Sequence, residues 1–320
     1  MTRKSFSILL LAALVVTLLV VLVGCASPSG TDAQGADEGT STADNTAAGT
    51  AITVTDQTGG LVTLDKPADR VVALTASACE IVYALGAGDT VVGRGEYCDW
   101  PAEALDVPAV SSGTETNIEQ IIALQPDLVL MASMDQTPDQ VQQIKDAGIQ
   151  VYVSDARDIA QTYESILHIG QLMGKNAEAS SIVDGMKQTF EALAAKQLSG
   201  TIYFEVSPLE YGLWTAGKGT FMNEVAELIG LENIFADLDD WAEVSEEQVL
   251  QRNPDFIVTV GMYFGSGPTP EEEIMGRPNW KDVTAVSKKQ VLDLSNNELS
   301  RPGPRLAQGA QALYDFVANS

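Results

Sequence analysis

Short runs of branched apolar residues recur along the chain, each bounded by glycine, acidic or other polar residues. Such runs predict buried strands, whereas the stretches between them have helical apolar spacing and end at glycine or before proline. Strands that alternate with short helices predict an α/β fold with mostly parallel sheets covered by helices. The expected strands are residues 71–74, 90–93, 128–131, 151–153, 202–206 and 291–294, and the expected helices are residues 79–85, 118–124, 141–147, 221–229 and 306–317.

Residues 159–197 depart from this alternation. Their helical propensity is continuous and no proline interrupts them. Apolar side chains at i, i+4, i+7, i+11 and i+14 share one face of a helix. Here that face carries Ile159, Tyr163, Ile166, Gly170 and Met173. We therefore expect one long helix, or two in tandem, between two α/β halves.

One stretch of the chain occurs twice. Residues 117–130 align without a gap to residues 245–258, so that Glu119 meets Glu247 and the sequence Pro-Asp recurs at the same place in both copies. Each copy has the pattern of a helix, a turn and a strand. Two copies of one unit predict two similar lobes, and a cleft between lobes is where we expect function.

The first 50 residues have the pattern of an export and tethering segment. Two basic residues are followed by an apolar run over residues 8–23 and by Gly24-Cys25, which resembles a bacterial lipobox. We expect residues 1–24 to be a lipoprotein signal peptide and Cys25 to take the lipid; the alternative is a plain membrane anchor. Residues 25–50 are almost wholly small and polar, as in a disordered tether.

The remaining residues suffice for two domains with their own cores. We expect an N-terminal lobe over residues 51–157, a connecting helix over 158–198 and a C-terminal lobe over 199–320. The formal net charge of the whole chain is −26, and its first 24 residues contain two basic residues and no acidic one. This charge argues against nucleic acid and against direct contact with anionic lipid headgroups.

Candidate catalytic and metal-binding motifs are sparse. The chain has no His-Glu-x-x-His, no Gly-x-Ser-x-Gly and a single histidine, His168, inside an expected helix. A phosphate-loop spacing ends at Lys218, but Gly219 stands where serine or threonine would hold magnesium. We expect a protein that is not an enzyme and has no cofactor and no resident metal. Cys79 and Cys98 could be bridged or free.

Several motifs follow one another in a recognisable order over roughly 250 residues. They lie at residues 85–89, 97–101, 117–119, 215–221, 231–235, 244–247 and 301–305. In this order the chain resembles the solute-binding proteins of ABC importers that carry cobalamin, ferric siderophores or haem. The resemblance implies two Rossmann-like lobes joined by a long rigid helix, as in class III periplasmic-binding proteins. The Tyr-Cys-Asp-Trp-Pro segment favours the cobalamin-binding members.

The same resemblance implies that Glu119 and Glu247 dock onto arginines of the membrane permease. Two exposed carboxylates on a rigid body can bind two arginines bidentately and fix the orientation of docking. A structural interpretation is also open. Asn117 and Ser245 have the pattern of helix N-caps, and a carboxylate in the first turn suits the helix dipole. Both interpretations can hold together.

Candidate ligand contacts are aromatic and cationic. Aromatic residues at expected loop positions near strand ends suit a large planar ligand, because open α/β sheets bind ligands at the carboxyl ends of their strands. Two arginines, in loops that the family places near the cleft, suit carboxylate, phosphate or siderophore oxygens. Ordinary loop packing and surface ion pairs are the alternatives. The candidates are Tyr97, Trp100, Trp214, Trp241, Arg94 and Arg301.

These patterns together predict a monomeric, lipid-anchored receptor on the outer face of the bacterial cytoplasmic membrane. We expect it to capture a metal chelate and deliver it to an ABC importer. Corrinoid ranks first as the ligand, ferric siderophore second and haem third. The less favoured alternatives are an extracytoplasmic enzyme and a receptor for a bare metal ion.

Overall fold

The computed structural model describes residues 51–133, 137–263, 265–294 and 297–320. The described residues belong to one compact unit of the chain. The expected signal peptide, Cys25 and the tether lie outside them. Within the described ranges, no helix combines the length and the apolar character needed to cross a membrane.

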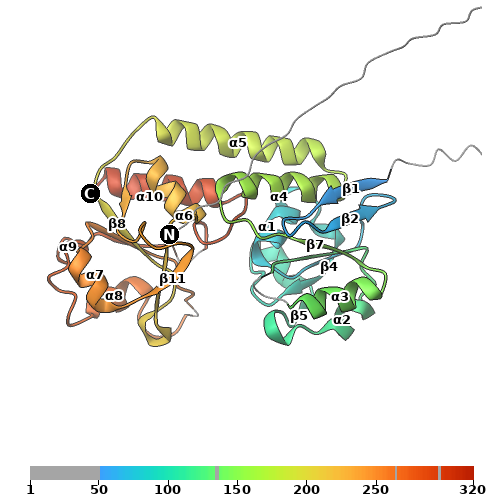
Figure 1. Ribbon diagram of the computed structural model, residues 1–320, viewed down its shortest axis with the longest axis horizontal. Helices are drawn as coiled ribbons and strands as arrows, with labels where there is room; N and C mark the ends of the chain where they lie inside the picture. The colour runs from blue at the N-terminus through green and yellow to red at the C-terminus, as the bar shows by residue number, and fades with distance from the viewer. Residues whose placement is uncertain (1–50, 134–136, 264, 295–296) are drawn as a thin grey trace, which may run out of the picture. The chain divides into compact units, whose positions relative to one another are not determined.

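The N-terminal half contains a five-stranded parallel sheet in the order β5-β4-β3-β6-β7, preceded by an antiparallel hairpin of β1 and β2 (Figure 1). Its central strands are buried on both faces, as expected for a parallel sheet between helices. The strands are β1 (Ile52–Thr55), β2 (Leu61–Leu64), β3 (Val71–Ala73), β4 (Val91–Gly95), β5 (Ala109–Val110), β6 (Leu128–Met131) and β7 (Gln150–Val153). The helices are α1 (Ala76–Ala84), α2 (Ile118–Ala123) and α3 (Pro138–Asp146), with short 3₁₀ turns at Gly88–Thr90, Ala102–Asp106 and Gly113–Glu115.

The C-terminal half contains a four-stranded parallel sheet in the order β10-β8-β12-β13. A separate antiparallel pair, β9 with β11, has no counterpart among the expected strands. The strands are β8 (Thr201–Glu205), β9 (Leu213–Ala216), β10 (Glu232–Asn233), β11 (Trp241–Val244), β12 (Phe256–Thr259) and β13 (Val291–Asp293). The helices are α6 (Phe221–Leu228), α7 (Glu246–Arg252), α8 (Pro270–Gly276), α9 (Thr284–Ser287) and α10 (Leu306–Ala318), with a 3₁₀ turn at Leu209–Tyr211.

Two helices, α4 (Ile159–Leu172) and α5 (Asn176–Ala194), connect the halves. They lie side by side rather than end to end, and α5 runs back along α4 (Figure 1). Gly174 allows the reversal because its φ is +67°, a backbone angle that side chains with a Cβ rarely adopt. The connection is thus a helix pair in which α5 also packs against α6 and α10 of the C-terminal half.

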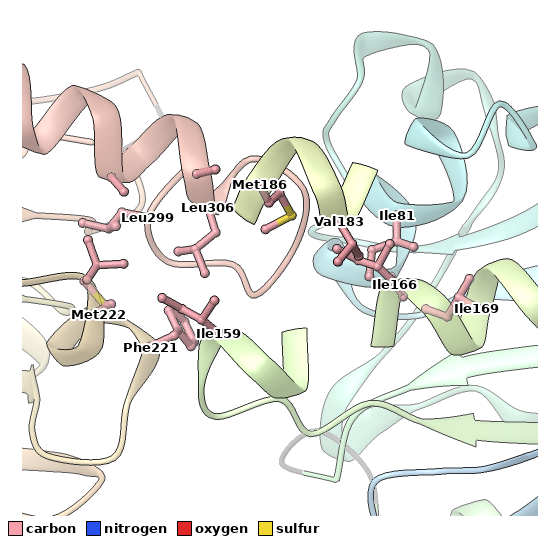
Figure 2. Close-up of a cluster of buried hydrophobic side chains, with 14 of the residues drawn as sticks. Ile81, Ile159, Ile166, Ile169, Val183, Met186, Phe221, Met222, Leu299 and Leu306 are labelled. Atoms are coloured by element: carbon pink, nitrogen blue, oxygen red, sulfur yellow. The ribbon is translucent and has the colours of Figure 1, made fainter. Parts of the chain in front are cut away.

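One hydrophobic cluster extends across this connection (Figure 2). It includes Ile81 of α1, Ile166 of α4 and Met186 of α5, and it continues to Phe221 of α6 and Leu306 of α10. A shared buried core resists separation of the halves, because opening it would expose apolar surface to water.

The two copies of the repeat fold alike. In each copy a short helix ends at a residue of positive φ, Gln125 (49°) or Asn253 (47°), and a buried proline follows. The next residue is an aspartate whose Oδ2 accepts a backbone N–H at the start of the neighbouring strand. Asp127 accepts from Arg70, just before β3, at 3.0 Å, and Asp255 accepts from Thr201, the first residue of β8, at 3.0 Å. The repeat therefore encodes the start of two adjacent parallel strands in both lobes.

Candidate functional site

Exposed aromatic and apolar side chains gather where the parallel strands end. In open α/β folds ligands bind at these carboxyl ends. Tyr97 follows β4 and is 57% exposed, and Tyr211 follows β8 and is 75% exposed. Met262 and Tyr263 follow β12 and are 51% and 40% exposed. Both lobes thus present large contact side chains at the edge where this class of fold binds ligands.

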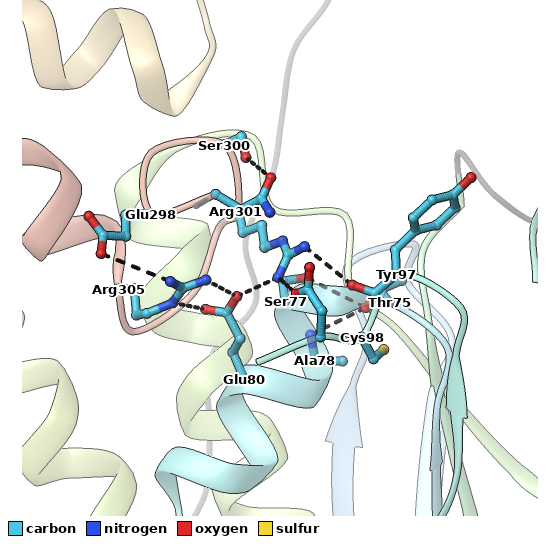
Figure 3. A network of polar contacts seen from close by, with 12 residues as sticks. Thr75, Ser77, Ala78, Glu80, Tyr97, Cys98, Glu298, Ser300, Arg301 and Arg305 are labelled. Atoms are coloured by element: carbon cyan, nitrogen blue, oxygen red, sulfur yellow. Dashed lines mark hydrogen bonds and ion pairs between the residues drawn. The ribbon is translucent and has the colours of Figure 1, made fainter. Parts of the chain in front are cut away.

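The loop after β4 carries two of the expected contacts, Tyr97 and Trp100. The Tyr97 side chain points away from the neighbouring polar network, as Figure 3 shows, while its backbone carbonyl accepts a hydrogen bond from Arg301 at 3.2 Å. Trp100 is half exposed, and the guanidinium of Arg305 lies over its ring at 4.5 Å. A cavity of about 250 Å³ lies beside this stacked pair and is also lined by Tyr83. The loop is thus held from below while its aromatic side chains stay accessible.

A buried ion network provides that support (Figure 3). Glu80 of α1 is almost fully buried and accepts from Arg301 at 2.9 Å and from Arg305 at 2.7 and 3.0 Å. Arg301 also donates to Asp99 at 2.7 Å. Burial acts to lower the pKa of Arg301, but its hydrogen bonds to Asp99 and Glu80 outweigh burial and raise the pKa. Arg305 secures the last helix, because it is the N-cap residue of α10 and its guanidinium binds Glu80 of α1.

The guanidinium of Arg301 is therefore already paired with Glu80 and Asp99 in this network. A role for it in direct ligand contact stays a prediction. The sequence contains one sign of this network. Glu80 stands among apolar residues of α1, and a buried carboxylate requires charged or hydrogen-bonding partners.

Arg94 is a correction to the sequence interpretation, because it lies in strand β4 and not in a loop. The strand extends to Gly95, since β3 pairs with it on one side and β5 on the other. At Gly95 a Cβ would lie 2.0 Å from the carbonyl oxygen of Leu74, so glycine allows this close pairing. The Arg94 guanidinium donates to the carbonyls of Val107 at 3.1 Å and Gly95 at 3.0 Å. Its side chain thus ties β4 to the segment before β5.

Trp214 and Trp241 are also corrected, since they lie within β9 and β11 rather than in loops. In the register of this antiparallel pair, Trp241 opposes Ala216 and Trp214 opposes Glu243. Residues two apart on a strand, and residues opposite one another, share a face. The two tryptophans therefore lie diagonally on one face of the pair.

This tryptophan face changes from exposed to buried along its length. Trp214 is 40% exposed, whereas Trp241 is half buried and packs edge-on against Phe221 with ring centroids 5.6 Å apart. The opposite face of the pair, with Leu213 and Val244, is buried in the core of the C-terminal lobe. Trp214 is consequently the better placed of the two tryptophans to contact a ligand.

Tyr211, Met262 and Tyr263 were missed by the sequence interpretation. The available sign was their position, because each is a large apolar residue close to glycine and soon after an expected strand. Exposed fraction, which only the tertiary structure gives, distinguishes these residues from core aromatics.

Glu119 and Glu247 occupy the same place in the two repeats. Each is the second residue of its helix, α2 or α7, and each is exposed. The pKa of Glu247 is lowered by hydrogen bonds from its own backbone N–H and from Ser245. The adjacent Glu246 points inward and accepts the indole N–H of Trp280 at 2.8 Å. Both lobes therefore display one carboxylate at the first turn of an equivalent helix.

The capping interpretation is confirmed. The side chains of Asn117 and Ser245 accept the backbone N–H of Gln120 and Gln248, respectively. Of these two caps, Ser245 forms a complete capping box and Asn117 does not, because the Gln120 side chain donates instead to the carbonyl of Ala109 at 2.9 Å. Docking by the two glutamates stays a prediction.

His168 is a packed residue, as expected. Its Nδ1 lies 3.2 Å from the hydroxyl of Tyr152, and the two rings meet edge to face. Across the described ranges, no three His, Cys, Asp or Glu side chains gather in a way that could hold a metal ion. A larger cavity, of about 750 Å³, lies at the amino ends of β8 and β12, beside Gly200 and Asp255, and so opposite to the aromatic edge.

Comparison with known proteins agrees with this geometry. A family model described as periplasmic binding protein matches residues 71–298. The chain belongs to the periplasmic binding protein family. Members of this family are extracytoplasmic binding proteins that deliver ligands to ABC transporter permeases, so this chain is a binding protein and not an enzyme.

Three similar proteins match this chain over nearly the whole of their own length. The chain is 34% identical over 307 residues, 93% of each chain, to the Bacillus subtilis protein named uncharacterized ABC transporter substrate-binding lipoprotein YvrC. It is 28% identical over 255 residues to the vitamin B12-binding protein of Vibrio cholerae, covering 78% of this chain and 90% of the relative. A solved structure of an ABC-type Fe3+-hydroxamate transport system from Saccharomonospora viridis matches with a TM-score of 0.69 and 25% identity, covering 82% of this chain and 98% of that one. The expected family and the two-lobed α/β fold are confirmed.

Proposed function

We propose that this protein is a lipid-anchored receptor that binds a metal chelate between its lobes, with a corrinoid as the favoured ligand, and delivers it to an ABC importer. The observation that carries the proposal is the set of exposed aromatic and apolar side chains at the carboxyl ends of the strands in both lobes. Large planar ligands are held by such faces together with a few polar groups. The lipid anchor at Cys25 rests on the lipobox and on the name of the Bacillus subtilis relative.

The charges near these strand ends favour a ligand without net negative charge. Arg94 donates to backbone carbonyls, Arg301 to Glu80 and Asp99, and Arg157 to Asp240 at 2.9 Å. Cations already engaged in this way are poorly available to propionates or to an anionic iron chelate. Cobalamin is neutral overall, and a ferric hydroxamate can be neutral, whereas haem carries two propionates. The order of ligands is therefore corrinoid, then neutral ferric siderophore, then haem.

Two similar proteins support the first two ligands of this order. The Vibrio cholerae relative is named for vitamin B12, and the Saccharomonospora viridis structure is named for Fe3+-hydroxamate transport. The Tyr-Cys-Asp-Trp-Pro segment, at residues 97–101, adds the likeness to cobalamin-binding members.

The test is a titration of the full chain, in detergent, with cyanocobalamin, cobinamide, a neutral ferric hydroxamate, a ferric catecholate and haem. Tryptophan fluorescence reports binding. We expect saturable quenching by the corrinoids, and a loss of affinity of about 10-fold or more in Trp214→Ala, because aromatic contacts are dominant in such sites. Leu61→Ala, an exposed apolar change on β2, is the matched control and should bind normally.

Tight binding of the catecholate or haem, with no binding of corrinoids, would contradict the ligand order. Binding of none of the five compounds by a folded chain would contradict the metal-chelate proposal itself.

A further inference from the structure

Two buried thiols meet beneath the ligand-side loop of the N-terminal lobe. Cys79 lies in α1, and Cys98 lies in the loop that follows β4. Both are completely buried and belong to one small apolar cluster with Ala73 and Ala104. The Sγ atom of Cys98 lies 3.4 Å from the carbonyl oxygen of Ala73. Neither thiol has a part in the site described above.

The two thiols interact with one another. The thiol of Cys79 hydrogen bonds to the sulfur of Cys98, and this bond lowers the pKa of Cys98 while it raises the pKa of Cys79. Both backbone positions are fixed: the N–H of Cys79 donates to the carbonyl of Thr75, and the N–H of Cys98 donates to the carbonyl of Gly95. Two thiols held in contact by a helix and a tight turn need little backbone movement to become linked.

We propose that Cys79 and Cys98 form an intrachain disulfide in the extracytoplasmic space, which fixes the loop of Tyr97 and Trp100 onto α1. Extracytoplasmic compartments permit disulfides, and members of this family act there. The proposal concerns the covalent state of the lobe, and it does not depend on which ligand is bound.

The chemistry requires a disulfide oxidant, either a small-molecule disulfide or the disulfide of a thiol oxidase. The thiolate of Cys98 attacks one oxidant sulfur, forms a mixed disulfide and releases the first oxidant thiolate. The thiolate of Cys79 then attacks the Cys98 sulfur and releases the second. Two protein thiols lose two protons and two electrons in total, and one oxidant disulfide becomes two thiols.

Burial determines when the bond can form and how it behaves. An oxidant reaches the sulfurs during folding or when the loop after β4 opens, because the closed loop covers both side chains. Once formed, the bond is shielded from reductants by the same packing. It closes a loop of 20 residues, from Cys79 to Cys98 inclusive, and so constrains the unfolded chain.

The test uses the full chain, exported by its own signal and extracted from membranes. Free thiols are blocked with N-ethylmaleimide in denaturant before trypsin digestion. We expect the peptide of residues 71–94 to be linked to that of residues 95–145, and to separate from it on reduction. We also expect the oxidised chain to melt about 5 °C above the reduced chain.

Cys79→Ala and Cys98→Ala are the matched controls, and their melting temperatures should not respond to reductant. The proposal would be overturned if N-ethylmaleimide labelled both cysteines of the exported chain, and if a separate, unlabelled sample still had two free thiols after refolding with oxidised glutathione. A disulfide joining either residue to Cys25 would overturn it as well.

Discussion

The two copies of the repeated unit share their backbone, whereas the surfaces around them differ. In both lobes a helix, a residue of positive φ, a proline and an aspartate lead into a buried strand that pairs in parallel with its neighbour. Around this common unit, the N-terminal lobe presents a loop after β4, and the C-terminal lobe presents the β9–β11 pair with Trp214. The part that specifies the fold is repeated, and the part proposed to contact ligand is particular to each lobe.

The lobes also differ in how they pair a buried glutamate. Glu80 accepts from two arginines of the segment before α10. Glu205, at the end of β8, is instead paired bidentately with a single arginine, Arg277, through two hydrogen bonds of 2.8 Å. Burial raises the pKa of Glu205, and its bonds to Arg277 oppose that rise. Glu80 joins α1 of the N-terminal lobe to the segment before α10, whereas Glu205 and Arg277 both belong to the C-terminal lobe.

The largest effect should come from removing these glutamates. Glu80→Ala leaves two buried guanidinium groups without their shared carboxylate, and should reduce the free energy of unfolding by about 3–5 kcal/mol. Glu205→Ala should cost less, because it removes a carboxylate from one buried guanidinium rather than two, and Glu273 still binds Arg277. Denaturant unfolding of both variants measures the difference, with Glu103→Ala, an exposed change, as the control. Equal losses would show that the two networks do not differ as their contacts indicate.

The second comparison concerns docking. If Glu119 and Glu247 bind permease arginines equivalently, Glu119→Lys and Glu247→Lys should each weaken association with the importer about 10-fold, and the double variant about 100-fold. Ligand uptake by vesicles that contain the cognate importer is the measurement. Ligand affinity should not change, and Glu103→Lys should behave as the unmodified chain. A loss confined to one lobe would break the proposed symmetry.

The third comparison tests the repeated aspartate. Asp127→Ala removes its hydrogen bonds to the backbone N–H groups of Asp69 and Arg70, and Asp255→Ala removes bonds to the N–H and hydroxyl of Thr201. Each variant should lose about 2 kcal/mol of unfolding free energy, since two donors lose a charged acceptor. Thermal or denaturant unfolding reads this directly. Asp127→Asn and Asp255→Asn, which keep one acceptor oxygen, should recover part of the loss.

The smallest effects concern the caps. Ser245→Ala breaks a complete capping box and should cost about 1 kcal/mol, and Asn117→Ala should cost somewhat less because its partner glutamine bonds elsewhere.

Loss of the Ser245 hydroxyl should also move the pKa of Glu247 up toward its ordinary value, as an NMR titration would show. A carboxyl group whose pKa is lower in the folded than in the unfolded state stabilises the fold at pH values above its unfolded-state pKa. That contribution is lost as the pH falls through its folded-state pKa. In Ser245→Ala the two pKa values of Glu247 lie closer together, so its contribution to stability should be smaller and should be lost over a narrower pH range. An unchanged Glu247 titration would show that Ser245 does not influence it.

The branched apolar runs, the repeat and the family motifs were sufficient to predict the parallel sheets, most of the helices and the family. The β1–β2 and β9–β11 pairs were missed because their strands are four residues long and mix polar with apolar positions. β5 and β10 are two residues each, too short for any periodicity. Trp214 and Trp241 were selected as site candidates, but their shared face follows from a strand register that the sequence did not reveal.

The sequence by itself determined what depends on local pattern. The alternation of strands and helices, the caps at Asn117 and Ser245, and the positions of Glu119 and Glu247 on equivalent turns all follow from residues near one another in the chain. Only the tertiary structure decided which distant groups meet. Glu80 with Arg301 and Arg305, Cys79 with Cys98, and the return of α5 along α4 are contacts whose energy comes from burial and charge pairing across the fold. Such contacts leave no periodic trace in the sequence, because their partners are brought together by packing and not by spacing.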